Sequence, residues 1–146
     1  MVEMSVAGIA LDAASRTPIV LLRDPSGRRQ VPIWIDQSQA HNIMAGLQGA
    51  EPPRPLSHDL MAALLVAGGL ELERVIVHAI EDSTFHAVLK LRQTDPLDAA
   101  DEGDVILHDV DARPSDAIAL AVRTGSSIWM LEEVVAEASI AVDAEA

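Results

Sequence analysis

The sequence predicts an α+β fold: a single compact domain in which an antiparallel or mixed β-sheet of five or more strands packs against three to four helices. Three observations predict it. The chain has 146 residues, of which 49% are hydrophobic, which suffices for one core. Short runs of alternating apolar residues come in pairs separated by turns, as is typical of antiparallel hairpins. Other segments repeat their apolar residues at helical spacing and begin with polar capping residues.

Three strands are predicted in the first third of the chain, from short runs of alternating or β-branched apolar residues at 2–6, 19–22 and 31–35. Asp24, Pro25 and Gly27 occupy the first, second and fourth positions of a type I turn. This turn joins the second run to the third, so we expect these two strands to form a hairpin.

Two helices follow. Asp36 and Gln39 are spaced as a capping box, and apolar residues then recur at helical spacing, which predicts a helix over 37–48. A proline-rich connector leads to a second predicted helix over 58–67, with Ser57 as its N-cap. Apolar residues cover nearly every side of this second helix, and such helices are typically buried. We therefore expect it to lie in the centre of the core.

The second half of the chain begins with another predicted hairpin. Residues 72–80 and 85–91 alternate in the strand pattern on either side of a short polar turn. An acidic loop is predicted over 94–104, and a further strand over 105–112.

The last predicted elements complete a single domain. Pro114 suits the first position of a helix and Gly125 suits its end, so a helix is predicted over 114–123. A short strand and a short helix are predicted after it. We expect one domain over residues 1–140 and a frayed tail over residues 141–146.

The composition excludes several classes of function. Acidic residues outnumber basic residues by 23 to 10, and the net charge of −13 opposes a protein that coats a phosphate backbone. Aromatic residues make up 2% of the chain, so base-stacking platforms are not expected. Because cysteine is absent, a metal would need carboxylate, histidine or carbonyl ligands. The sequence has neither a membrane-length apolar segment nor a basic leader, so a cytoplasmic protein without a membrane partner is expected.

Two similar helix starts carry the candidate chemistry. The segments RPLSHD (54–59) and RPSD (113–116) each place Arg-Pro ahead of a serine and an aspartate. Backbone N–H groups at a helix start bind anions, and a guanidinium can clamp a phosphate. The predicted substrate-binding residues are therefore Arg54, Arg113 and Ser115.

The acidic residues around these starts are candidates for cation binding and proton transfer. Asp109 and Asp111 lie two positions apart in a predicted strand, so their side chains share one face. The predicted ligands of a magnesium or manganese ion are Asp59, Asp111 and Asp116. The predicted catalytic residues are His58, Asp59 and Asp116, because carboxylates and a histidine that titrates near neutral pH can transfer protons.

Structural alternatives remain open for the same residues. An aspartate in the first turn of a helix stabilises that helix by about 0.3–1 kcal/mol without any ligand. Arg113 could pair with Asp111 or Asp116 and hold the strand-to-helix turn. His58 could be a helix-start residue that is simply hydrogen-bonded to a neighbour.

Four segments of the chain together resemble the bifunctional nuclease domain family. They are VPIWI (31–35), PRPLSHDLM (53–61), STFHAVLKL (83–91) and DARPSDAIALAVR (111–123). The resemblance extends from about Met4 to Ala138. Some members of the family carry an additional UVR-type domain, which is not expected in this sequence. It implies an enzyme that cleaves both RNA and DNA, and a domain that self-associates as a homo-oligomer.

Two functions of different classes follow. The first is metal-assisted hydrolysis of RNA or single-stranded DNA at the two helix starts. The second is a non-catalytic oligomeric module that binds an anion or a protein through the same helix starts. The net charge of −13 and Gln39, where the family carries a glutamate, favour the second function. In a third, structural interpretation the polar groups only cap helices. Both functions require the two helix starts to meet in space.

Overall fold

The computed structural model describes residues 1–49, 51–94 and 107–142. It contains an eight-stranded mixed sheet with the order β6-β5-β4-β7-β1-β2-β3-β8. The pair β4–β7 is parallel, and the other neighbouring strands are antiparallel. The strands are β1 (Val2–Leu11), β2 (Pro18–Arg23), β3 (Arg29–Trp34), β4 (Leu70–Glu81), β5 (Thr84–Gln93), β6 (Leu107–Ala112), β7 (Ser127–Met130) and β8 (Ile140–Ala141).

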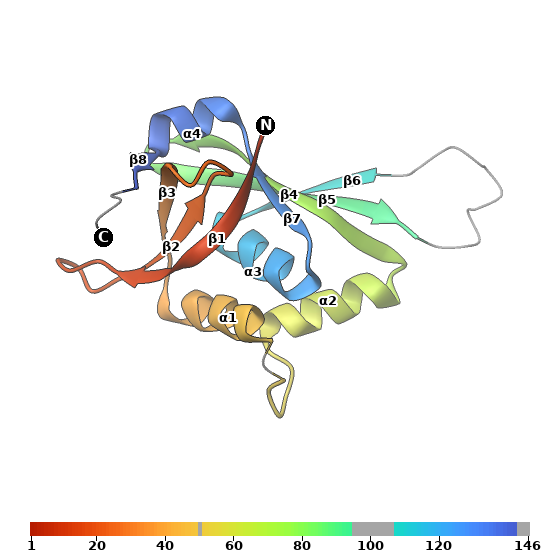
Figure 1. Ribbon diagram of the computed structural model, residues 1–146. Coiled ribbons are helices and arrows are strands. Elements are labelled where there is room, and N and C mark those ends of the chain that lie inside the picture. The colour runs from red at the N-terminus through yellow and green to blue at the C-terminus, as the bar shows by residue number, and fades with distance from the viewer. Residues whose placement is uncertain (50, 95–106, 143–146) are drawn as a thin grey trace.

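Three of the four helices in the described part of the chain form a layer on one side of this sheet (Figure 1). The four helices are α1 (Gln37–Gln48), α2 (Ser57–Ala67), α3 (Pro114–Thr124) and α4 (Glu132–Ala138). Figure 1 shows α1, α2 and α3 together on one side, with α4 on the side away from them. Helix α3 contacts both α1 and α2 as well as β4 and β5, so it is the central helix of the layer. The structure confirms the predicted α+β class and the single domain.

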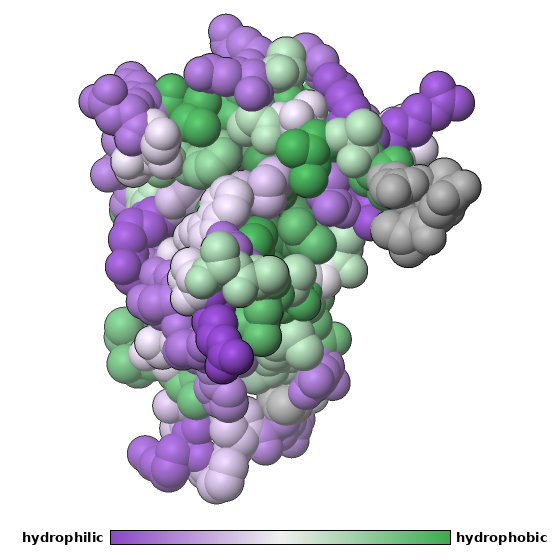
Figure 2. Space-filling view, turned by 90° about the vertical axis from the view of Figure 1, so that its left-hand side faces the viewer, coloured by the Kyte–Doolittle hydropathy of each residue, from purple (hydrophilic) through white to green (hydrophobic). Residues whose placement is uncertain are grey.

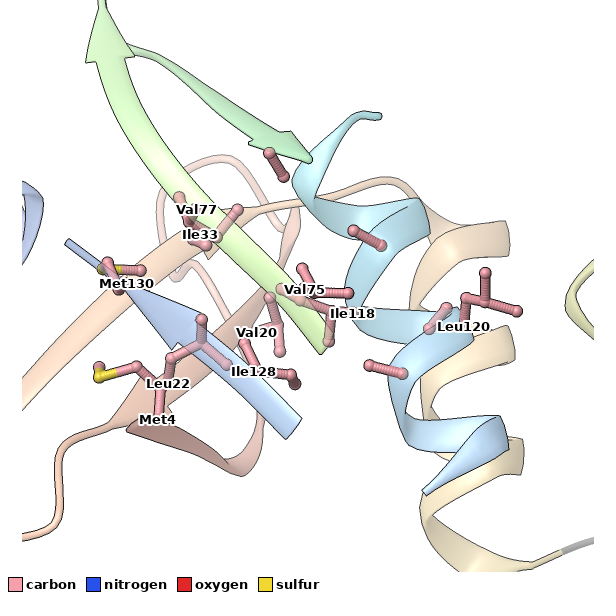
Figure 3. Close-up of a cluster of buried hydrophobic side chains, with 14 of the residues drawn as sticks. Met4, Val20, Leu22, Ile33, Val75, Val77, Ile118, Leu120, Ile128 and Met130 are labelled. Atoms are coloured by element: carbon pink, nitrogen blue, oxygen red, sulfur yellow. The ribbon is translucent and has the colours of Figure 1, made fainter. Parts of the chain in front are cut away.

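The core lies between α3 and the sheet. Figure 3 shows Ile118 of α3 directed toward Val75 of β4, with Val20 and Ile128 beside them. Ile118, Val75 and Val20 have no exposed surface, and Ile128 is 5% exposed. Small residues on α3 let it approach the sheet and α1 closely. At Gly46 of α1, an added Cβ would lie 2.8 Å from Cγ1 of Val122, so a side chain there would push the two helices apart.

The predicted turn at Asp24, the capping box at the start of α1 and the end of α3 at Gly125 are confirmed. Asp36 accepts a hydrogen bond from the Gln39 backbone, and the Gln39 side chain accepts one from the Asp36 backbone, so the capping box is complete. The Gly27 N–H donates to the Asp24 carbonyl at 3.0 Å, as a β-turn requires. Gly125 ends α3 in the left-handed conformation, with φ of 72°.

The predicted place of α2 in the core is wrong. His58 is the only buried residue of this helix, whereas Leu60 is 55% exposed, Leu64 61% and Val66 78%. Helix α3 occupies the position against the sheet, so α2 packs on the outside of α3 and turns much of its apolar surface to solvent. The N-cap also differs from the prediction: it is Leu56, and Ser57 is the first helical residue.

Three predicted segments are only partly described. Of the strand predicted over 105–112, the structure describes Leu107–Ala112. The acidic loop predicted over 94–104 lies, except for Thr94, outside the described residues. Ala141, the first residue of the predicted tail, pairs with Arg29 in the β3–β8 ladder, and Val142 donates a backbone hydrogen bond to Arg28 at 2.9 Å. The tail residues 143–146 lie outside the described part of the chain. Among the described residues, no helix has the length and apolar character needed to cross a membrane.

Candidate functional site

The first turns of α2 and α3 meet at a histidine and an aspartate. His58 Nε2, from the start of α2, lies 3.7 Å from Oδ1 of Asp116, from the start of α3. Two arginines complete this group of polar side chains. We name His58, Asp59, Arg113, Asp116 and Arg123 the polar cluster. The structure therefore brings four predicted residues together, namely His58, Asp59, Arg113 and Asp116.

Asp116 is the solvent-facing acid of the polar cluster. Its Oδ2 accepts a hydrogen bond from Arg113 Nε at 2.8 Å, and its side chain is 28% exposed. The carboxylate raises the pKa of Arg113 further above its ordinary value. Of the two pairings left open for Arg113, the structure shows the one with Asp116. Because this pairing uses Nε and the arginine side chain is 68% exposed, the guanidinium remains accessible to an anion.

Asp59 connects α2 to the far end of α3. Its Oδ1 lies 2.6 Å from Nε of Arg123, and its Oδ2 accepts the backbone N–H of Leu56 at 2.8 Å. The Asp59 and Arg123 side chains are each 19% exposed. One oxygen of Asp59 thus holds α2 against α3, and the other caps the start of α2 itself. This contact pattern gives Asp59 a positioning role, beside the catalytic and ligand roles predicted for it.

His58 is buried without a hydrogen bond. It is 4% exposed, and neither ring nitrogen has a hydrogen-bond partner among the described residues. Burial lowers the pKa of His58 below its ordinary value, although the nearby Asp116 opposes this shift. The imidazole is therefore neutral at pH 7 and keeps one nitrogen free to accept a proton. A buried polar group without a partner costs about 1–3 kcal/mol, which calls for a functional explanation.

This burial predicts a pH dependence of stability. The unfolded chain binds a proton at His58 with the ordinary pKa of 6.5, more tightly than the folded chain does. Stability from this site is therefore complete above pH 6.5 and decreases as the pH falls below it. In His58→Gln, the loss of unfolding free energy between pH 7.5 and pH 5.5, measured by urea denaturation, is expected to be smaller than in the unsubstituted chain.

A matched control uses an exposed histidine of the helix layer. His41, on α1, is exposed, so His41→Gln should leave the pH dependence of the unfolding free energy unchanged. An equal pH dependence in His58→Gln and in the unsubstituted chain would show that burial does not affect the protonation of His58.

The structure does not bring Arg54 and Asp111 to the polar cluster. Arg54 is exposed on the connector before α2, and among the described residues no hydrogen bond or ion pair joins it to the cluster. Asp111 pairs with Val88 across β5 and β6, whereas the next pair, Ala112 with Ala87, faces the core beneath α3. Because successive side chains in a strand point to opposite faces, Asp111 lies on the sheet face away from α1, α2 and α3.

The donor set does not fit a resident cation. In the part of the chain that the structure describes, no group of three or more His, Cys, Asp or Glu side chains is arranged to hold a metal ion. Asp59 and Asp116 are each paired with an arginine, and Asp111 lies across the sheet from them. The magnesium or manganese ion remains a prediction, and no catalytic step below depends on it.

A cavity of about 490 Å³ adjoins the polar cluster at Arg113. It lies where the starts of α1 and α3 approach the end of β3 and the β4–β5 turn. Ser115, which is buried, lines it, as do Trp34, Gln39 and Phe85. Gln39 is held there by the capping box, so its amide has a structural role. Figure 2, a view onto the side of the molecule that lies at the left of Figure 1, shows hydrophobic residues exposed among hydrophilic ones.

Sequence reasoning missed two residues of this region, Arg123 and Trp34. Arg123 had a detectable signal, because it follows Asp116 by seven positions and so lies on the same side of α3. Trp34 carries no such signal in the sequence, because it lines the same cavity as Arg113 only once distant segments of the chain have folded together.

The comparisons with known proteins agree with the resemblance found in the sequence. A family model described as the bifunctional nuclease domain matches residues 20–143. Two proteins of Mycobacterium tuberculosis are similar to the chain: the uncharacterized protein MT1877 of strain CDC 1551 / Oshkosh and the uncharacterized protein Rv1829 of strain ATCC 25618 / H37Rv. Each is 38% identical over 145 residues, which are 99% of this chain and 80% of that protein.

Proposed function

The chain belongs to the bifunctional nuclease domain family, and from this membership we propose that it hydrolyses phosphodiester bonds of RNA or single-stranded DNA at the polar cluster. One observation carries the proposal beyond the family. Asp116 lies between an exposed arginine and a buried histidine, at the junction of α2 and α3. This arrangement supplies a group that accepts a proton and a group that binds phosphate.

Each member has a distinct role in the proposed reaction. Arg113 binds the non-bridging oxygens of the phosphate and stabilises the negative charge that increases during attack. Asp116 orients a water molecule and takes its proton as the water oxygen bonds to phosphorus. The P–O bond to the leaving oxygen breaks, and that oxygen takes a proton from solvent water. His58, 3.7 Å behind Asp116, can receive that proton. Asp59 and Arg123 keep α2 in place.

The test is cleavage by the purified chain. Labelled RNA and single-stranded DNA are incubated with magnesium, with manganese or with EDTA, and the products are separated by size. Cleavage that depends on the chain supports the proposal. Since the net charge is −13, a cation can also act by screening repulsion, and sodium chloride at matched ionic strength separates this effect from a specific cation site.

The non-catalytic module remains the second candidate. In each of the pairs Asp116–Arg113 and Asp59–Arg123 the two opposite charges balance. Such pairing is expected of a cluster that mainly joins two helices. If the chain is such a module, phosphate or a phosphorylated ligand should raise its melting temperature while no substrate is cleaved.

We further propose that α2 mediates self-association with a second copy. Leu60, Ala63, Leu64 and Ala67 recur at the spacing of one helix face, and all four are exposed. A two-fold contact would bury this stripe against its own copy. Leu64→Lys places a charge in the middle of the stripe and should convert the oligomer to a monomer in sedimentation velocity.

A matched variant places the same charge elsewhere. Leu11, at the end of β1, is 67% exposed, and Leu11→Lys should leave the oligomer intact. A monomer for the unsubstituted chain, or an oligomer for Leu64→Lys, would refute the role of α2. The oligomeric state and the cytoplasmic location remain predictions of the sequence.

A further inference from the structure

Trp34 lies at the end of β3 with its indole held at one edge. The ring Nε1 donates a hydrogen bond to Oδ2 of Asp12 at 2.9 Å, while the residue is 54% exposed. A large aromatic side chain in contact with water loses the stabilisation that burial would bring. The hydrogen bond fixes the ring without covering its faces, so an indole face is available to a planar ligand.

Arg113 contributes to the same cavity as Trp34. The cavity of about 490 Å³ is within the size range of small-ligand sites. Phe85 and Pro114 add apolar surface to its lining, and Thr84 adds a hydroxyl group. A flat apolar ring, a guanidinium and a hydroxyl together match the three parts of a nucleotide: base, phosphate and sugar.

Resting on the proposed function, we propose that this cavity binds one nucleotide of a single strand, with its base stacked on Trp34 and its phosphate on Arg113. Every base has a π face, so the site is indifferent to base identity. A base in a duplex is already stacked on both sides, which restricts the site to unpaired nucleotides. The ion pair between Arg113 and Asp116 then places that phosphate next to the polar cluster.

This site explains how so acidic a chain can hold a nucleic acid. Its affinity comes from stacking and from one guanidinium rather than from a basic surface. The low aromatic content predicted the absence of a stacking platform, but a count of aromatics does not tell where each one lies. One exposed tryptophan beside an arginine is sufficient for a single-nucleotide site.

The experiment measures binding apart from cleavage. Trp34 and Trp129 are the two tryptophans of the chain, so Trp129→Phe leaves Trp34 as the only indole emitter. Titrating this variant with oligothymidylate or oligouridylate in EDTA should quench its fluorescence to saturation. Introduced into the chain without the Trp129 substitution, Trp34→Ala should weaken the binding of a labelled oligonucleotide about tenfold, which is the scale of one lost stacking contact. Trp34→Phe should retain most of the affinity.

Several outcomes would overturn the inference. These are an absence of saturable quenching, equal weakening in Trp34→Ala and Trp34→Phe, or equal affinity for a duplex of the same length. Equal weakening would assign the effect to the hydrogen bond with Asp12. Trp129→Phe is the matched control and should bind the labelled oligonucleotide as the unsubstituted chain does.

The two proposals fail in different ways. If the chain binds through Trp34 and cleaves nothing, the nucleotide site is supported and the hydrolase function is refuted. If Trp34→Ala cleaves with the same KM as the unsubstituted chain, the hydrolase function is supported and the nucleotide site is refuted. The quenching measurement needs no substitution at Trp34, so it decides the inference even if Trp34→Ala does not fold.

Discussion

Replacing Asp116 by asparagine is expected to lower the rate of phosphodiester cleavage by at least about a hundredfold, the lower end of what general acid–base catalysis contributes. The amide has nearly the same shape and can still accept the hydrogen bond from Arg113 Nε, so the helix junction should persist. It cannot take a proton from water. Initial rates on labelled RNA, with thermal denaturation of both proteins to confirm folding, measure the effect.

Asp111→Asn is the matched control for this substitution. It removes the same charge five positions earlier in the chain, but Asp111 lies on the sheet face away from α1, α2 and α3. We expect the Asp111 variant to cleave at the unsubstituted rate. Equal losses in the two variants would instead support the predicted three-carboxylate cation site, and cleavage that survives Asp116→Asn would exclude Asp116 as the proton acceptor.

Ile118→Ala is expected to have the largest effect on stability, a loss of about 2–5 kcal/mol in the free energy of unfolding. Ile118 has no exposed surface and lies on the helix that packs directly against the sheet. Removing its side chain leaves a cavity facing Val75, and neither the sheet nor the helix can move to fill it completely. Urea denaturation followed by circular dichroism measures the loss.

The same truncation at an exposed aliphatic residue should cost little. Leu11 is 67% exposed at the end of β1, and Leu11→Ala is expected to change the free energy of unfolding by less than about 0.5 kcal/mol. A loss below about 1 kcal/mol for Ile118→Ala would contradict the position of α3 at the centre of the core.

The sequence by itself determined the features that depend on near neighbours in the chain. The capping box of Asp36 and Gln39, the turn at Asp24 and the ends of α3 are set by hydrogen bonds and backbone angles within about five residues. The strand and helix periods were also readable, because they reflect which sides of a segment are apolar. These signals sufficed for the α+β class.

Only the tertiary structure decided which segments lie next to one another. Apolar residues show that α2 and α3 each need a partner, but they do not show which of the two takes the central place against the sheet. Helix α3 takes it and contacts β4, β5 and β7. Two acids of one short segment therefore have different neighbours. Asp116 lies next to His58, whereas Asp111 lies on the other face of the sheet. The pairing of Trp34 with Arg113 around one cavity also depends on chain segments almost eighty residues apart. Such contacts follow from the packing of the whole chain, because no local interaction specifies them.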